Sequence, residues 1–174
     1  MARADRTPVV GLATLDDAAL EELVAHAVPD TALEDVMPVA PGPAEWTSAR
    51  LQAFIEFHRG RRGGLDGPAR EVSFAVRVDG MASGVVRLQR VSAGALEVGM
   101  WLARSARGHG VGGQVLVAAA QRAAELGARK LVAETTAGNL AALAALQRAG
   151  ARISSPSETG AVHAELDLAR FTGS

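Results

Sequence analysis

The sequence predicts an α/β fold in which a mixed, mostly antiparallel sheet is flanked by helices, and three observations support this prediction. The chain has 174 residues, enough for one hydrophobic core and few for two. Apolar residues make up 48% of it and charged residues 21%, the balance of a folded globular protein. Strand-like alternation and helical spacing follow one another along the chain. We therefore expect residues 1–174 to form a single domain.

The first half of the chain contains one predicted strand and two predicted helices. An apolar run over 9–15 predicts the strand, and the acidic start at Asp16 predicts a helix over 16–27, since negative side chains stabilise helix N-termini. Four prolines fall within 29–43, which we expect to be an irregular covering segment. Helical spacing resumes over 48–62 and ends at glycines.

The second half adds five predicted strands and two helices. Alternation over 71–78 predicts a strand, and Asp79 with Gly80 forms a hairpin turn signal. Two further alternating runs complete three antiparallel strands in succession, and after them strands alternate with alanine-rich helices that end at glycines. The remaining predicted elements are strands over 83–91, 96–102, 130–135 and 162–168 and helices over 111–126 and 140–149.

Charge and composition exclude several partners. The formal net charge is −1, so no overall field attracts nucleic acid or anionic lipid. The one dense basic cluster, 58–62, has no interleaved aromatic pattern for stacking bases, and we interpret it as the solvated end of a helix. The longest apolar stretch, 140–146, is far shorter than the roughly 20 residues of a membrane span. With no signal-peptide pattern at the start, we expect a cytoplasmic protein.

The types and spacing of the reactive side chains exclude other chemistry. The chain has no cysteine, which rules out disulfides, thiolate nucleophiles and cysteine-bound zinc. The histidines lack metal-binding spacing, and we expect no metal site; they are His26, His58, His109 and His163. We expect the two tryptophans, Trp46 and Trp101, to pack in the core rather than line an acceptor pocket, and the acids Glu34 and Asp35 to be solvated.

A glycine-rich segment between a predicted strand and a predicted helix is the strongest sign of a binding site. It runs from 102 to 113 and places glycines around the start of the helix. Glycine allows a ligand close to the backbone, and the free N–H groups of a helix start favour an anion. Arg104 and Arg107 add positive charge. The segment therefore predicts an anion site, most simply for phosphate.

The same glycines also fit a dinucleotide-binding fingerprint. Residues 108–113 read G-x-G-x-x-G, and Glu134 on the next strand would be the ribose partner. That fingerprint places its first glycine at the end of a strand in an early β-α-β unit, whereas here 103–107 intervene and an antiparallel meander precedes. A dinucleotide-binding domain is therefore the weaker alternative.

Three motifs resemble those of the GNAT superfamily of acyl-CoA-dependent N-acyltransferases. Arg107 to Gly112 resembles its R/Q-x-x-G-x-G/A pyrophosphate loop, and 97–103 is similar to the E-I-G-Y-W-L-A strand of the branch that includes ribosomal-protein alanine acetyltransferases. Residues 139–150 share the asparagine-to-glycine spacing of the second cofactor motif. Together the motifs cover about 73–151. Residues 1–70 match no motif of the family, and that half usually shapes its acceptor site.

The resemblance implies a fold and a co-substrate site. Two central parallel strands would splay into a V, with acetyl-CoA between them and no metal. Asn139 would bond the pantetheine arm, although a simple helix cap is the alternative reading of that residue. The backbone along the arm would come from Met100, Trp101 and Leu102, and the pyrophosphate would bind Arg107, Gly108, His109, Gly110, Val111, Gly112 and Gly113.

The resemblance also implies a carboxylate base, since attack on a thioester needs a neutral amine. Glu134 and Glu97 are the two candidates, and for each the alternative is a solvent-facing strand carboxylate. Many family members carry a tyrosine or serine that reprotonates the leaving thiolate, but this chain has no tyrosine and holds Ala141, Ala142 and Leu146 at those places. The acid stays open between water, residues of the unmatched half and two histidines, His109 and His163.

The function that these motifs predict is direct acetyl transfer from acetyl-CoA to a primary amine, on a small molecule or a peptide N-terminus. No covalent intermediate is expected, because cysteine is absent and no other activated nucleophile is evident. A non-catalytic acyl-CoA sensor is the alternative that the missing acid suggests. The acceptor is not specified by the sequence, and the protein is expected to be a monomer or a homodimer.

Overall fold

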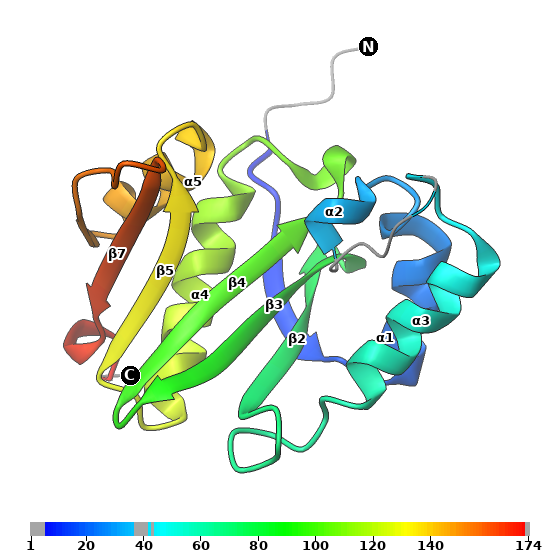
Figure 1. Ribbon diagram of the computed structural model, residues 1–174, viewed down its shortest axis with the longest axis horizontal. Helices are drawn as coiled ribbons and strands as arrows, with labels where there is room; N and C mark the ends of the chain where they lie inside the picture. The colour runs from blue at the N-terminus through cyan, green and yellow to red at the C-terminus, as the bar shows by residue number, and fades with distance from the viewer. Residues whose placement is uncertain (1–5, 37–41, 43, 173–174) are drawn as a thin grey trace.

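A seven-stranded sheet forms the centre of the structure, a computed structural model that describes residues 6–36, 42 and 44–172 (Figure 1). The strand order is β1-β2-β3-β4-β5-β7-β6, and only β4 and β5 run parallel. The strands are β1 (Val10–Thr14), β2 (Glu71–Val78), β3 (Met81–Ser92), β4 (Ala95–Leu102), β5 (Lys130–Thr136), β6 (Arg152–Ile153) and β7 (Ala161–Asp167). The mixed, mostly antiparallel sheet predicted from the sequence is confirmed.

Five α-helices and a short π-helix surround this sheet in the described part of the chain. They are α1 (Asp17–Glu22), the π-helix (Leu23–Ala27), α2 (Leu33–Val36), α3 (Ser48–Arg59), α4 (Val111–Glu125) and α5 (Leu140–Arg148). Side chains cap three of them: Asp16 accepts from the N–H of Ala19, Thr47 from Arg50 and Asn139 from Ala142. Among the described residues, no helix is long and apolar enough to cross a membrane.

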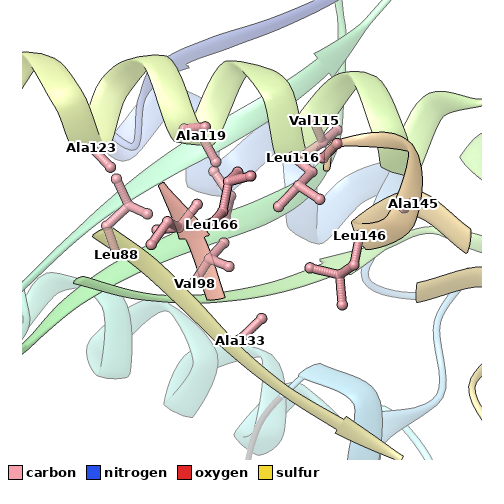
Figure 2. Close-up of a cluster of buried hydrophobic side chains, with 14 of the residues drawn as sticks. Leu88, Val98, Val115, Leu116, Ala119, Ala123, Ala133, Ala145, Leu146 and Leu166 are labelled. Carbon is pink, nitrogen blue, oxygen red and sulfur yellow. The ribbon is translucent and has the colours of Figure 1, made fainter. Parts of the chain in front are cut away.

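The helices divide between the two faces of the sheet. One face packs against α4 and α5, and Figure 2 shows side chains of the strands, such as Leu88, Val98 and Leu166, meeting those of α4. Alanines such as Ala119 and Ala123 face the strands, and their small side chains allow the helix to lie close to the sheet.

The other face is covered over half of its width. The helices α1 to α3 pack a second core against β2, β3 and the end of β4, centred on Phe54 and Trp101. Figure 1 shows β5 and β7 beside this layer with no described helix in front of them. Their outward-facing side chains, among them Glu134 and His163, are exposed. The sheet therefore has one fully covered face and one half-open face.

Most predicted elements occur in the predicted order, and the differences have local causes. The helix predicted over 16–27 changes to a π-helix after Glu22, and the N–H of Val28 donates to the carbonyl of Leu23 five residues earlier. The short β6 was not predicted, and the segment predicted as irregular contains α2 in its described part, 29–36. Of the rest of that segment, 37–43, the structure describes only residue 42.

The basic cluster lies at the end of α3 as predicted, with Arg59 and Arg62 exposed, but His58 is buried and the expectation of a solvated side chain was wrong for it. His58 is only 7% exposed and stacks edge-on against Phe54 and Phe57. The arginines that follow are paired: Arg62 and Arg59 with Asp17, and Arg61 with Glu71. The partners lie on α1 and β2, far away in the sequence, so the basic run itself did not reveal them.

Candidate active site

The two parallel strands at the centre of the sheet separate along their length. They pair at three positions, Ala95–Lys130, Leu96–Leu131 and Glu97–Val132. Beyond this point β4 stays paired with β3 and β5 with β7, while the two strands diverge from one another (Figure 1). A V-shaped gap therefore opens between 98–102 and 133–136. Along its sides, main-chain N–H and C=O groups face no partner strand within the described structure, which makes them available to a ligand.

The side of the gap formed by β4 offers backbone rather than reactive side chains. Trp101 turns its ring away into the second core against Phe54, with 8% of the residue exposed. Its indole Nε1 is buried and has no hydrogen-bond partner among the described residues. Met100 lies on the opposite face and is 38% exposed, although its neighbours Val98 and Leu102 are buried there.

The glycine-rich loop has three successive residues in a backbone region that favours glycine, and two of them are glycines. Gly108, His109 and Gly110 follow one another with φ of 87°, 51° and 76°, in the left-handed region. Gly110 is the N-cap of α4, and no side chain caps this helix. The N–H groups of Gly112 and Gly113 therefore have no partner at its first turn within the described part of the chain.

Packing does not explain the glycines of this loop. A Cβ atom placed on Gly108, Gly110, Gly112 or Gly113 would meet no atom within 4 Å. Gly112 and Gly113 also have ordinary helical backbones, so neither strain nor crowding requires glycine at these two positions. A ligand that approaches the N–H groups of the helix start would require it, and an anion is the ligand that these groups favour.

The loop is fastened to the segment that carries α2. Asp30 accepts a hydrogen bond of 2.8 Å from the N–H of Ser105, and its carbonyl accepts from the N–H of Arg104. Hydrogen bonds from Ser105, first that of its backbone N–H, lower the pKa of the Asp30 carboxyl. The Arg107 guanidinium donates to the carbonyl of Leu102 at 3.0 Å and to Asp35 at 3.1 Å. The expectation that Asp35 is merely solvated was wrong.

A groove continues from the loop along the outer side of α4. It has a volume of about 460 Å³, which lies within the usual range of small-molecule sites. Gly110, Gly113 and Gln114 line its start, and Ala145 and Arg148 of α5 line its far wall. The anion site thus lies between the V-shaped gap and a groove large enough for part of a ligand.

Asn139 occupies the N-cap position of α5, as the alternative reading of this residue predicted. Its side-chain Oδ1 accepts from the N–H of Ala142 at 3.1 Å. The carboxamide nitrogen is then the end of this side chain that can donate to a ligand. Ala141 and Leu146, which stand where the resemblance led us to expect hydroxyl side chains, lie on the same helix.

The two candidate carboxylates project from the half-open face, and they differ in their partners. Glu97 lies at the last paired position of β4, and Arg87 donates to its Oε1 at 3.2 Å. Arg87 also lies 3.7 Å from Glu71, which is buried at 2% exposure and paired with Arg61 at 3.3 Å. Glu97 is therefore the outer end of a network of fixed charges.

Glu134 lies beyond the paired part of β5, on the side of the gap. Its Oε1 contacts Nδ1 of His163, which lies directly opposite on β7, at 2.5 Å. Both side chains are about half exposed. The structure therefore brings together a carboxylate and an imidazole that are 29 residues apart in the sequence.

Sequence reasoning missed three residues that shape this site and one contact. Asp30 holds the loop, Arg87 binds Glu97 and Glu71 anchors Arg87, while His163, named only as a candidate acid, contacts Glu134. Strand alternation carried a partial signal for the last pair, because Glu134 and His163 both occupy outward positions of neighbouring strands. The other three contacts join segments whose pairing no local pattern specifies.

Comparison with known proteins agrees with this geometry. The family model described as acetyltransferase (GNAT) domain matches residues 10–152. No curated protein sequence matches the chain.

Solved structures share the fold at low sequence identity. Mycobacterium smegmatis RimJ in complex with CoA-disulfide superposes with a TM-score of 0.76 at 17% identity, over 97% of this chain and 86% of that one. The Vibrio cholerae spermidine N-acetyltransferase in complex with CoA and spermine gives 0.70 at 13%, over 94% and 98%. RimL, a ribosomal L7/L12 alpha-N-protein acetyltransferase solved with CoA, gives 0.68 at 17%, over 91% and 93%.

Proposed function

Because the chain belongs to the GNAT acetyltransferase family, we propose that it transfers an acetyl group from acetyl-CoA directly to a primary amine. One observation carries this proposal: an uncapped helix start with free N–H groups lies beside a gap between two parallel strands. A dinucleotide-binding domain would need its first glycine at the end of a strand in an early β-α-β unit. Here a 3₁₀ turn (Arg104–Ala106) separates β4 from the glycines, and the antiparallel strands β2 to β4 come first.

The loop residues fit the diphosphate of the co-substrate. The N–H groups of Gly112 and Gly113 would donate to its oxygens, and glycine leaves room for the close approach. Gly108, His109 and Gly110 shape the turn, while Arg107 adds positive charge near it. Beyond the diphosphate, the groove between α4 and α5 would take the nucleotide end, with Arg148 as a cation in its wall.

The gap would hold the extended arm of the co-substrate as a partial replacement for a strand. Main-chain groups of Met100, Trp101 and Leu102 along β4 would bond its amides, in the way that an added strand bonds a sheet edge. A backbone N–H of this edge would also polarise the thioester carbonyl. Asn139 would donate its carboxamide N–H₂ from the other side.

Of the two carboxylates, Glu134 is the better placed to act on an incoming amine. It lies next to the open part of the gap and on the half-open face, from which an acceptor can approach. Glu97 lies where the strands are still paired and holds Arg87 on one oxygen. We therefore assign the proton-removing function to the site of Glu134 and keep Glu97 as the second candidate.

The acceptor class stays broad. Structures with this fold include a protein N-terminal acetyltransferase and a spermidine acetyltransferase, and their substrates differ in size. An acyl-CoA sensor without turnover is the second candidate function, which the alanines and leucine at the usual acid positions favour. Both functions place acetyl-CoA in the same gap.

Titration calorimetry with acetyl-CoA, followed by a screen of amines for CoA release, tests the proposal. The panel should contain peptides with free N-termini, polyamines and small primary amines. Saturable binding with turnover of at least one amine is expected, and thermal shift with NAD or NADP serves as the control for the dinucleotide reading. Absence of acetyl-CoA binding at millimolar ligand contradicts the proposal, and binding without turnover of any amine favours the sensor.

A further inference from the structure

We propose that the protein has a second anion site, in which Arg70 and Arg90 hold a phosphate group, either free or attached to a small molecule. The site lies where β2 begins and β3 ends, away from the glycine-rich loop. It involves none of the residues to which acetyl transfer has been assigned, so this inference does not depend on that function.

A cavity of about 580 Å³ opens between the segment that leads into β2 and the last part of β3. Its volume exceeds that of a phosphate group and falls in the range of small-molecule sites. Two guanidinium groups supply charge to its wall, while a leucine and a proline supply apolar surface. The lining residues are Leu65, Asp66, Gly67, Pro68, Arg70 and Arg90. This lining fits an anionic group with a small organic body attached.

The cavity and the proposed acetyl-CoA site lie at opposite ends of the same strands. Arg90 pairs with Leu96, in the part of β4 that is still joined to β5. Gly84, at the other end of β3, pairs with Leu102, from which the chain continues into the glycine-rich loop. The two ends of β3 are about 20 Å apart at the usual rise of a strand. Figure 1 shows the segment between α3 and β2 at the end of the sheet where β4 begins.

The two arginines oppose one another across the strand pair. Glu71 pairs with Gln89, and at the next position the N–H of Arg90 donates to the carbonyl of Arg70 at 2.8 Å. Like charges at directly opposite positions destabilise a sheet, so this arrangement costs stability unless an anion lies between them.

Within the described part of the chain, one ion pair is recorded for these two arginines. It joins Arg90 to Asp66 with 3.5 Å between nitrogen and oxygen, which is longer than a good hydrogen bond. The side chain of Asp66 is fully exposed, so water screens this contact strongly. The positive charge of the cavity therefore remains largely uncompensated.

Arg70 has a backbone conformation that suits glycine better than arginine. Its φ is 52°, in the left-handed region, which a long side chain adopts only at a cost. Gly64 meets a similar requirement in the same segment with φ of 71°. The side chain of Arg70 is exposed, and no hydrogen bond or ion pair is recorded for it in the described structure. Folding thus does not explain arginine at this position, whereas a ligand in the cavity does.

The segment around the cavity is held in place without a ligand. A Cβ atom on Gly67 would lie 2.7 Å from backbone atoms of Gly63, so the chain closes on itself more tightly than another residue would allow. The N–H of Gly67 donates to the carbonyl of Gly64, and the N–H of Arg70 donates to that of Gly67. Gln89 on β3 binds the carbonyl of Ala69 at 3.3 Å. Such prior order lowers the entropy that a ligand must overcome.

A phosphate group matches these arginines better than a carboxylate does. It carries up to two negative charges near neutral pH, enough to balance both guanidinium groups. Its oxygens also accept the paired N–H donors of arginine in a bidentate arrangement. Leu65 and Pro68 would contact an organic body attached to the phosphate.

A titration with sodium phosphate at constant ionic strength, followed by amide NMR on the full chain, tests the site. Saturable shifts at 65–70 and at Arg90 are expected, with a Kd of about 1 mM. The amides of 110–113 report separately on phosphate at the glycine-rich loop. Phenyl phosphate is titrated in the same way. Tighter binding of phenyl phosphate assigns the site to an organic phosphate, and equal binding assigns it to the free ion.

Two variants remove one cation each. Arg70→Gly removes a guanidinium and relieves the backbone, so phosphate should bind about 10-fold more weakly while the Tm in phosphate-free buffer rises. Arg90→Met keeps a long side chain on the strand and should weaken phosphate binding to a similar extent. Arg129→Met is the control, since Arg129 is exposed and does not line the cavity. It should keep the affinity of the wild type.

Three outcomes overturn the inference. The first is the absence of saturable shifts at 65–70 and Arg90 up to about 50 mM phosphate. The second is wild-type affinity in both Arg70→Gly and Arg90→Met. The third is an equal loss in Arg129→Met, which would mean general attraction of anions to a basic surface. Failure of acetyl-CoA to bind would refute the proposed function and would leave each of these readings unchanged.

Discussion

The two faces of the sheet differ in what holds them together. The face under α4 and α5 is built from apolar and small side chains, with Ala119, Ala120 and Ala123 fully buried against the strands. The face under α1 to α3 contains charged and polar groups at the same depth, among them Glu71 and His58. Both faces belong to one sheet, so we attribute the difference in buried polar groups to the different functions of the two faces.

This difference indicates which features belong to the fold and which to this protein. The α4 face presents the loop and helix start that bind the co-substrate in our proposal, and its motifs are those that resemble the family. The opposite face carries the two candidate carboxylates and the network from Glu71 through Arg87 to Glu97. Changes on the first face should therefore alter ligand affinity, and changes on the second should alter stability, pH dependence and acceptor chemistry.

The largest effect is expected for Gly112→Val, on the α4 face. An added Cβ meets no protein atom within 4 Å and the backbone is helical, so folding should be unaffected while the ligand is blocked. Loss of two charge-assisted hydrogen bonds predicts acetyl-CoA binding weaker by about 1,000-fold, about 4 kcal/mol, measurable by calorimetry. Gly11→Val, on edge strand β1 with equally open space, is the control. Unchanged affinity of Gly112→Val would remove the loop from the binding site.

The face under α1 to α3 should make the free energy of unfolding depend on pH, because it buries His58. Burial, with a smaller contribution from Arg61 and Arg62, lowers the pKa of His58 to about 4. The unfolded chain then binds a proton that the folded protein rejects, so stability is lost as pH falls from about 6.5 to 4, by about 3 kcal/mol.

His58→Phe should remove this part of the pH dependence, because phenylalanine fills the place between Phe54 and Phe57 without a titrating nitrogen. Urea unfolding of both proteins at pH 7 and pH 4.5 measures the difference. Equal pH dependence of the wild type and the variant would show that burial does not lower the pKa of His58.

Arg87→Met should destabilise the protein by about 1–2 kcal/mol, because Glu71 loses one of its two arginine partners while buried. Arg87 is about one third exposed, which keeps the effect below that of a fully buried pair. In a Glu71→Gln background the same substitution should cost much less, which a double-mutant cycle of unfolding free energies measures. Equal costs in both backgrounds would rule out coupling of the two residues.

The smallest effect is expected for the ion pair that links α2, on one face, to the glycine-rich loop that leads into α4, on the other. Asp35→Asn removes the carboxylate that holds Arg107, so the guanidinium becomes free for an anion at the loop. We expect acetyl-CoA to bind about two- to fivefold more tightly, in keeping with an exposed ion pair. The gain should shrink in high salt. Weaker binding would instead mean that the link to α2 orders the loop for its ligand.

The fold could be predicted where its causes are local. An apolar run identified β1, strand patterning identified β2 to β5 and β7 to within a few residues, and glycine and acidic residues marked helix ends such as that of α4. The anion-binding loop could be located from the sequence because its glycines lie within one short segment, 108–113. Where a contact needs two distant segments, as for Asp30 with Ser105, no local pattern specifies it.

The candidate site shows the same division. Glu97 and Glu134 were identified as carboxylates near the gap, but their partners decide how they differ, and those partners are Arg87 and His163. The helix end at His58 was misjudged for the same reason, since burial against Phe54 depends on how α3 lies on the sheet. The first half of the chain thus needed the tertiary structure before its charges could be interpreted.

The short ladder between β4 and β5 also has a mechanical consequence. Only three residue pairs hydrogen-bond the β1–β4 half of the sheet to the β5–β7 half, and the shared core under α4 supplies the rest of the joint. A molecule that bonds both walls acts as a clamp. Amide hydrogen exchange in β5 should then slow on ligand addition far more than exchange in β2, and the protein's resistance to heat becomes a gauge of how well that clamp fits.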